Sequence, residues 1–241
     1  MTAQIGWIGR AERLVNEIVP VFMNSEKRDK NDGTNIIRNN LGQSFLALAY
    51  QTPNGFHRSY DLVDTNNSLD DWSNYRLSHL PESRIVMATI TRVANLNGHA
   101  KIPAVTYRET DNHKLIIGTT GSATECAKLL EIQSIKGDTE DISDWIVRNG
   151  LENISQTLEQ ITQVPCNMNM VFTLVDKKVD DTTVYLLRSK SKTPNSRPYL
   201  SFSNTNLGLV YSSLPEEASH LMSKEYQSLK EESVATIKIT K

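Results

Sequence analysis

The sequence has few cysteines, little net charge and no long hydrophobic run. Its two cysteines, Cys126 and Cys166, lack metal-ligand spacing, so we expect two buried thiols in a reducing compartment. The formal net charge of -2, without a long block of either sign, disfavours nucleic acid and membrane surfaces as partners. No apolar run approaches the ~20 residues of a membrane span, and the N-terminus lacks the pattern of a signal peptide. We therefore expect a soluble, cytoplasmic protein.

Several motifs of common enzyme classes are also missing. The sequence contains neither G-x-G-x-x-G nor a glycine-rich phosphate loop followed by lysine, and it has no Gly-x-Ser-x-Gly nucleophile elbow. Four histidines, His57, His79, His113 and His220, show no metal spacing. We therefore expect no metal and no cofactor, and any chemistry must come from the side chains.

Apolar and β-branched runs between polar turns are the commonest pattern that is present. They predict strands at Gln4–Ile8, Ser44–Tyr50, Arg84–Thr91, Lys114–Gly118, Met168–Val175, Thr183–Arg188, Tyr199–Phe202 and Leu207–Ser212, with a late edge strand at Val234–Ile239. Polar segments at 24–34, 64–74 and 189–198 are expected to be loops.

Helical periodicity lies mainly in the middle of the chain. It predicts helices at Ala11–Met23, Ser122–Gln133, Asp138–Arg148, Leu151–Thr162 and Pro215–Leu229. Strands followed by helices and then by strands favour an α+β fold of stacked sheets flanked by helices. We expect a single domain over residues 1–241, in which residues 214–241 supply a C-terminal helix and the edge strand.

A hydroxyl near the N-terminus is the first candidate for chemistry. Removal of Met1 would leave a free α-amine on Thr2, with a pKa near 8, which could act as a base toward the adjacent hydroxyl. The alternative is that Thr2 is an arbitrary second residue. The strand predicted directly behind it favours a functional role, because it would anchor the terminus inside the fold.

Three further candidates follow along the chain. Arg92 ends an apolar strand, where its guanidinium can bind a carboxylate or form a structural ion pair. The segment Gly118–Gly121 joins a strand to a helix, and its amides can face an oxyanion or simply form a tight turn. Asp138 opens a helix, where it can accept an ammonium group or cap the helix. His99 is a candidate general acid or base, although a loop histidine is the plainer interpretation.

At these positions the chain resembles the class II glutamine amidotransferases, whose glutaminase domain is an N-terminal-nucleophile hydrolase. The resemblance spans about residues 2 to 213. The matching segments are Thr2-Ala3-Gln4-Ile5-Gly6 for C-G-I-x-G, Gly42–Ala49 for R-G-x-D-S-A-G-x-A, Asn54-Gly55-Phe56 for the turn that follows, Thr91–Ala94 for T-R-[WY]-A-T, Asn97–Ala100 for N-A-H-P, Thr119-Thr120-Gly121 for H-N-G, Gly137–Glu140 for S-D-T-E, and Met168–Arg188 for a later strand pair. The resemblance implies a four-layer αββα sandwich of two mainly antiparallel sheets.

The family's roles carry over to some of these positions. In the family the arginine binds the glutamine carboxylate, the aspartate binds its α-amine, and the asparagine and glycine of H-N-G form the oxyanion hole. The resemblance therefore implies substrate binding by Arg92 and Asp138, with Asn97 and His99 on the substrate side and Gly121 at the oxyanion.

The catalytic centre departs from the family. Thr2 occupies the position of the nucleophilic cysteine, Thr120 that of the oxyanion asparagine, and Ser44 that of a strand aspartate. Losing one oxyanion donor lowers the rate about a hundred- to a thousandfold. We expect no synthase domain beside the glutaminase-like part.

Two hypotheses about function follow. The first is a catalytically degenerate amidotransferase-like module that binds glutamine or a related amino acid and acts with a protein partner or as a homo-oligomer. The alternative is an active amidohydrolase that uses Thr2 after removal of Met1 and supplies ammonia to a separate synthase.

Overall fold

The computed structural model describes most of the chain in two compact units. The described residues are 2–9, 43–52, 55–63, 84–93, 105–121, 123–133, 138–192, 200–205, 208–213, 216, 218–222 and 225–239. Unit 1 comprises Met1–Ala100 and Phe202–Tyr226, and unit 2 comprises Lys101–Ser201 and Gln227–Lys241. The chain therefore passes between the units three times.

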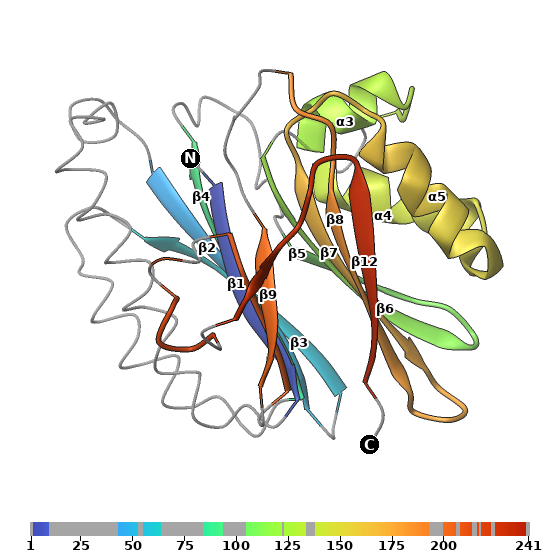
Figure 1. The fold of residues 1–241 in the computed structure, drawn as a ribbon. Coiled ribbons are helices and arrows are strands. Elements are labelled where there is room, and N and C mark those ends of the chain that lie inside the picture. Colours follow the sequence, from blue (N-terminus) through green and yellow to red (C-terminus); the bar gives the residue numbers. More distant parts are fainter. Residues whose placement is uncertain are drawn as a thin grey trace, which may run out of the picture. The chain divides into compact units, whose positions relative to one another are not determined.

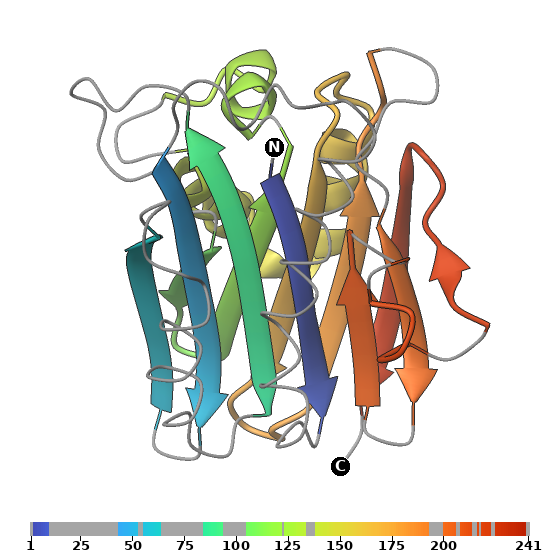
Figure 2. The same cartoon turned by 90° about the vertical axis from the view of Figure 1, so that its left-hand side faces the viewer.

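Unit 1 contains nearly all of a seven-stranded sheet. Its order is β11-β9-β10-β1-β4-β2-β3. The strands are β1 (Thr2–Gly9), β2 (Gln43–Thr52), β3 (Gly55–Val63), β4 (Ile85–Val93), β9 (Ser201–Thr205), β10 (Gly208–Ser212) and β11 (Gln227–Ser228). Figure 2 shows β1, in blue, as a central strand between the green β4 and the orange β10. Both of these neighbours run antiparallel to β1.

Central strand β1 is buried along most of its length. Alternate residues such as Ile5 and Trp7 face one side of the sheet, and Gln4 faces the other. All three are at most 2% exposed. A strand covered on both faces in this way holds a fixed register, because a slip by one residue would exchange the two faces.

Unit 2 is built on a five-stranded sheet with helices on one face. Its order is β12-β8-β7-β6-β5. The strands are β5 (Val105–Glu109), β6 (His113–Thr120), β7 (Asn169–Asp176), β8 (Thr182–Arg188) and β12 (Ser233–Ile239), and the helical elements are α3 (Ala123–Leu129), α4 (Asp138–Arg148), the short 3-10 helix η4 (Leu151–Asn153) and α5 (Ile154–Thr162). The three α-helices lie together on the same side of the sheet in Figure 1.

The core of unit 2 lies between those helices and the sheet. The strands contribute residues such as Ile117 and Phe172, and the helices contribute Ile142, Ile146 and Leu158, all of them fully buried. At the edge of this layer the Arg108 guanidinium forms an ion pair with Asp144, which joins β5 to α4. The core therefore ties all of the helices that follow β6 to the face of the sheet that they cover.

Most of the predicted elements in the described residues are confirmed. Helix α4 has the expected bounds and ends before Gly150, whose φ of 88° suits glycine. The helix expected over 151–162 begins as a 3-10 turn and continues as α5. The helix expected at Ala11–Met23 and the loops at 24–34 and 64–74 lie outside the described residues.

The helix expected over 215–229 is wrong for the part that is described. Residues 218–222 form turns, in which the Leu221 amide donates to the Ala218 carbonyl, and residues 227–228 form β11 beside β9. The Leu229 amide donates to the Leu200 carbonyl at 2.8 Å. Turn hydrogen bonds at 218–222 and strand pairing at 227–229 therefore take the backbone groups that a helix would have used.

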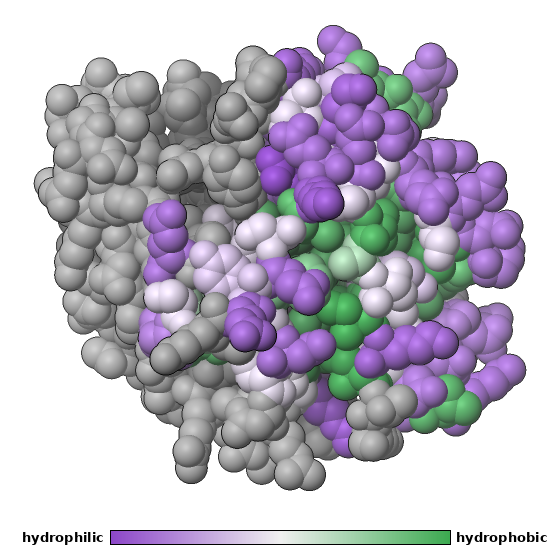
Figure 3. Space-filling model, in the orientation of Figure 1, coloured by the Kyte–Doolittle hydropathy of each residue, from purple (hydrophilic) through white to green (hydrophobic). Residues whose placement is uncertain are grey.

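The expected edge strand near the C-terminus is present as β12. It pairs with β8 and lies at the end of the five-stranded sheet. Ile237 and Ile239 are half-buried, whereas Thr236 and Lys238 are exposed. In Figure 3 the green apolar atoms along this strand are surrounded by purple hydrophilic ones. An exposed lysine on an edge strand discourages pairing with another chain.

The fold class is α+β with two antiparallel sheets. The pairings recorded between named strands in the described residues are all antiparallel. In the same part of the chain, no helix is both long enough and apolar enough to cross a membrane.

Candidate functional site

The strand pairing in unit 1 brings Thr2 next to the predicted arginine segment. Thr2 is the first residue of β1 and lies opposite Thr91 of β4, one residue before Arg92. On the other side of β4, Ser44 of β2 lies opposite Arg92. Thr2, Arg92 and Ser44, three positions of the resemblance, therefore lie on the neighbouring strands β1, β4 and β2.

Gly6 allows β1 to pack closely against its neighbours. A Cβ atom at this position would lie 2.3 Å from the Val86 carbonyl oxygen and 2.4 Å from the Tyr211 hydroxyl oxygen. Only glycine fits so close an approach. Tyr211 itself is fully buried, and burial raises the pKa of its hydroxyl, so it stays a neutral phenol at physiological pH.

Gln4 and Thr89 form a buried polar pair two residues from Thr2. They lie opposite each other on β1 and β4, and both are 0% exposed. Among the described residues, neither the Gln4 side-chain amide nor the Thr89 hydroxyl finds a hydrogen-bond partner. The Gln4 backbone is well held, because its N–H donates to the Ser213 hydroxyl and its carbonyl accepts from the Ser213 N–H, both at 2.9 Å.

In unit 2 a hydrogen bond joins two of the predicted segments. The hydroxyls of Thr119, near the end of β6, and Thr139, the second residue of α4, lie 2.7 Å apart and are buried. The glycine-turn segment 119–121 therefore lies against the segment that contains Asp138. The two hydroxyls are 20 residues apart in the sequence, and only the packing of α4 on the sheet brings them together.

Thr120 and Gly121 end β6 in a tightly constrained turn. Gly121 has a φ of +93°, and a Cβ there would lie 2.1 Å from the Asn167 carbonyl oxygen. The adjacent Thr120 is 1% exposed, and its hydroxyl makes no hydrogen bond within the described structure. The turn thus requires glycine for packing reasons, whatever its functional role.

The predicted site residues fall into two groups, one in each unit. Thr2 and Arg92 lie on the adjacent strands β1 and β4 of unit 1. In unit 2, Thr120 and Gly121 lie at the end of β6 and Asp138 at the start of α4, and the Thr119–Thr139 hydrogen bond joins these two ends. Asp138 is the first residue of α4.

Two predicted substrate-side residues have no structural description. Asn97 and His99 lie outside the described residues. Their assignment stays a prediction from the sequence.

The chemistry available at the described positions of unit 2 is mainly that of hydroxyls and backbone amides. Thr119, Thr120 and Thr139 carry neutral groups that donate and accept hydrogen bonds. Across the residues that the structure describes, no group of three or more His, Cys, Asp or Glu side chains is placed to hold a metal ion.

Gln4 is the residue that sequence reasoning did not single out. The N-terminal strand alternates Thr2, Gln4 and Gly6 with Ala3, Ile5 and Trp7, a pattern of one polar and one apolar face. Such alternation predicts an exposed polar face, but Gln4 is fully buried. The sequence shows a polar residue at position 4, but only the structure shows that its side chain is buried.

The comparisons with known proteins add no assignment. A scan against models of protein families finds no family that matches the chain, and a search among curated proteins finds no match either. Any function must therefore be argued from the residues and their geometry.

Proposed function

We propose that this chain is a class II glutamine amidotransferase-like protein that has lost efficient catalysis and acts as a binding or structural module in an assembly. The observation that carries the proposal is the buried 2.7 Å hydrogen bond between Thr119 and Thr139. It joins the segment that corresponds to the family's oxyanion turn to the segment that corresponds to its ammonium-binding aspartate. The β1–β4 register also supports the proposal. It pairs Thr2 with Thr91, the residue before Arg92, which the resemblance implies as the binder of the glutamine α-carboxylate.

The proposal includes an N-terminal-nucleophile hydrolase-like αββα sandwich. In unit 2 the helices cover one face of the sheet, and residues of the other face, such as Ile116, Val171 and Leu186, are 0% exposed. A sheet with helices on one face and apolar residues on the other is what one half of such a sandwich requires.

The ligand that suits these positions is glutamine or a related amino acid. Arg92 would bind the α-carboxylate as a forked donor, and Asp138 would accept the α-ammonium group. By the same resemblance Thr2, Thr120 and Gly121 would face the side-chain amide, with Asn97 and His99 on the substrate side.

Loss of efficient catalysis follows from the residue chemistry. A threonine hydroxyl is much less acidic than a cysteine thiol, whose pKa is about 8.5, so Thr2 is a poorer nucleophile at neutral pH. At the oxyanion position the buried Thr120 offers a short hydroxyl in place of a longer side-chain amide. One missing oxyanion donor alone costs about 3–4 kcal/mol in the transition state.

Titration calorimetry with L-glutamine tests the binding role. We expect the Arg92→Ala and Asp138→Ala variants to bind about ten- to a hundredfold more weakly than the parent chain, because each loses a charge-assisted contact. The Arg148→Ala variant is a matched control, because Arg148 is an exposed arginine at the last residue of α4. Equal heats in the parent and Arg92→Ala proteins would reject the proposed binding role.

The second candidate is an active amidohydrolase that uses Thr2 and supplies ammonia to a separate synthase chain. The start of β1 at Thr2, beside the Thr91–Arg92 segment, favours it. This activity needs the free α-amine of Thr2 as a base. An intact mass that includes Met1 in the native protein would exclude it.

A further inference from the structure

The two threonines that end β6 face opposite sides of the sheet. Thr119 faces the helices, where its hydroxyl lies 2.7 Å from that of Thr139. Because successive residues of a strand face opposite ways, Thr120 faces the other side. There it is 1% exposed, and its hydroxyl has no hydrogen-bond partner in the described structure. The Thr120 hydroxyl is therefore a buried polar group that is available to a ligand.

Asn169 brings a second polar side chain to the same face of the sheet. It lies directly opposite Thr120 in the antiparallel pairing of β6 with β7, and it is 0% exposed. Residues that oppose each other in this way have their Cβ atoms about 4.5–5.5 Å apart on one face. A hydroxyl and a carboxamide therefore lie side by side at the end of the sheet, and each can both donate and accept hydrogen bonds.

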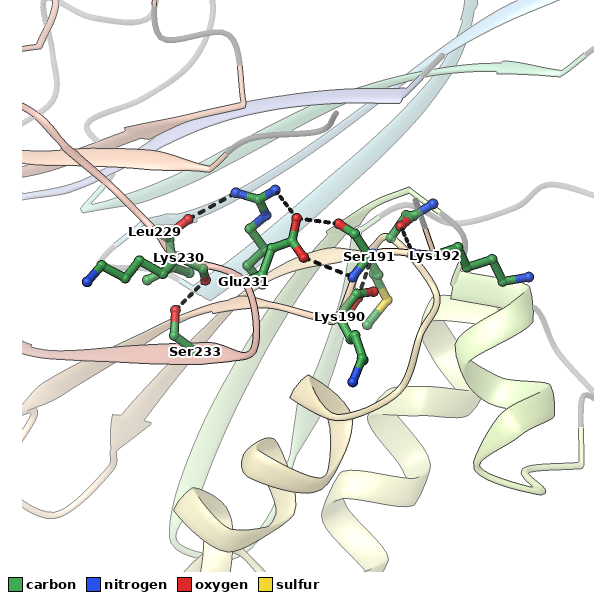
Figure 4. A network of polar contacts seen from close by, with 11 residues as sticks. Lys190, Ser191, Lys192, Leu229, Lys230, Glu231 and Ser233 are labelled. Carbon is green, nitrogen blue, oxygen red and sulfur yellow. Dashed lines mark hydrogen bonds and ion pairs between the residues drawn. The ribbon is translucent and has the colours of Figure 1, made fainter. Parts of the chain in front are cut away.

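Arg188 continues this row of polar residues on the next strand. It lies opposite Asn169 in the pairing of β7 with β8. Its guanidinium donates to the Glu231 carboxylate at 3.0 Å and to the Leu229 carbonyl at 3.2 Å. The Ser191 hydroxyl donates to the same carboxylate at 2.7 Å, and Figure 4 shows these contacts. Because the charge of Arg188 is paired with that of Glu231, the remainder of the row carries only neutral hydrogen-bonding groups.

The Thr120–Asn169 pair lies directly below the surface of unit 2. Gly121, the residue after Thr120, is exposed, and Asn167, two residues before Asn169, is half-buried. A Cβ atom at Gly121 would lie 2.1 Å from the Asn167 carbonyl oxygen, so the two turns pack closely and no side chain extends from position 121. A ligand that approaches at Gly121 therefore has to reach inward by only one residue to contact the Thr120 hydroxyl.

We propose that Thr120 and Asn169 form a neutral subsite that binds the primary carboxamide of a ligand and so selects glutamine over glutamate. The inference rests on the proposed function, to which it adds Asn169 and the selectivity. A carboxamide offers N–H donors and a carbonyl acceptor, which match a hydroxyl and a second carboxamide. A carboxylate has only acceptors and would bring an unpaired charge into a buried neutral site, which is unfavourable. Binding of the amide there does not replace the missing cysteine thiol.

Titration calorimetry on the full chain with three amino acids tests the subsite. L-Glutamine is compared with L-glutamate and with L-norvaline, whose side chain ends at the same carbon without the amide group. We expect the parent chain to bind glutamine about tenfold more tightly than either analogue, or better. Equal affinities for glutamine and norvaline would overturn the subsite but leave the proposed amino-acid binding intact. Absence of binding to all three would overturn both.

Two variants locate the selectivity. Thr120→Val removes the hydroxyl, Asn169→Leu replaces the carboxamide by an apolar group of similar size, and we expect each to bring the glutamine affinity to within about threefold of the norvaline affinity. Thr173→Val is the matched control, because Thr173 is also on β7, is 0% exposed, and has a hydroxyl without a partner in the described structure. It should keep the parent selectivity. Unchanged selectivity in Thr120→Val would overturn the proposal, even if Asn169→Leu fails to fold.

Discussion

Two pairs of buried polar side chains, one pair in each unit, differ in whether they have hydrogen-bond partners. In unit 2 the Thr119 and Thr139 hydroxyls lie 2.7 Å apart and satisfy each other. In unit 1 the side chains of Gln4 and Thr89 are equally buried, but their polar atoms have no hydrogen-bond partner among the described residues. A buried polar group without a partner costs about 1–3 kcal/mol. The first pair therefore stabilises the fold, whereas the second is a stability cost that a bound water or ligand would remove.

The largest expected effect concerns the packing beside the unpaired side chains of unit 1. We expect Gly6→Ala to lower the free energy of unfolding by about 3 kcal/mol, because the new Cβ would lie 2.3 Å from the Val86 carbonyl oxygen. Urea denaturation of the parent and variant proteins measures this loss.

Gly55→Ala is the matched control for that substitution. Gly55 has a φ of +139°, but no atom of the described residues, apart from its chain neighbours, lies within 4 Å of the Cβ that alanine would add. It should therefore cost only backbone strain of about 1 kcal/mol. Equal losses in the two variants would mean that the close approach of β1 to its neighbours at Gly6 costs no more than backbone strain at an open position.

The hydroxyl pair of unit 2 should have the next largest effect. We expect Thr139→Val to cost about 2 kcal/mol, because it leaves the buried Thr119 hydroxyl without its partner. The double variant with Thr119→Val should recover part of that loss, which a double-mutant cycle on denaturation free energies measures. Thr236→Val, at an exposed threonine on β12, is the control and should change little. Strictly additive losses would mean that the two hydroxyls are not coupled.

The side chains of Gln4 and Thr89 in unit 1, which have no hydrogen-bond partner in the described structure, should respond in the opposite way. We expect Gln4→Met and Thr89→Val to change the free energy of unfolding by less than about 1 kcal/mol or to stabilise the protein, because each removes polar atoms that have no partner in the described structure. Thermal unfolding followed by circular dichroism measures both variants. A loss as large as that of Thr139→Val would show that a bound molecule already satisfies Gln4 and would remove the contrast between the two pairs.

The smallest effect is the pH dependence from the surface of unit 2. The hydrogen bond from the Ser191 hydroxyl, with the Ser191 amide and Arg188 adding to it, lowers the pKa of Glu231. Since the folded pKa lies below the unfolded value of about 4.3, this contribution is complete above pH ~4.3 and is lost as the pH falls through the folded pKa.

Glu231→Gln should remove that dependence. The variant should lose less stability than the parent chain between neutral and acidic pH in denaturation series. Glu232→Gln is the control, because the Glu232 carboxylate forms a surface ion pair of 3.5 Å with Lys190, of the kind that contributes little. Parallel acid profiles for the parent and Glu231→Gln would show that Glu231 is not the group responsible.

Local sequence signals predicted the three α-helices of unit 2, although α3 ends at Leu129, before the expected Gln133. The bounds of α4 follow from its apolar spacing and from the Asn149-Gly150 stop. The same reasoning failed for the described part of residues 215–229, where residues 218–222 form turns and residues 227–228 form β11. It also missed β3, because Gly55 was assigned to a turn, and the short strand β5, which ends in two charged residues. Pairing with distant strands, and not local preference, decides these segments.

The candidate site could be predicted only as separate segments. The sequence identified Thr120, Gly121 and Asp138, but not the hydrogen bond between Thr119 and Thr139 that joins their segments. It did not indicate that Gln4 would be buried without a partner in the described structure, or that both thiols would lie in one hydrophobic cluster. Each of these facts depends on which elements pack together, which the local pattern does not contain.

Ammonia release from L-glutamine tests the central claim most directly. The parent chain, Thr2→Ala and Arg92→Ala are assayed under the conditions in which calorimetry detects binding. The account predicts that the parent chain binds glutamine but releases no more ammonia than Thr2→Ala does. Ammonia release by the parent chain that disappears in Thr2→Ala would contradict it and would establish an active N-terminal threonine hydrolase.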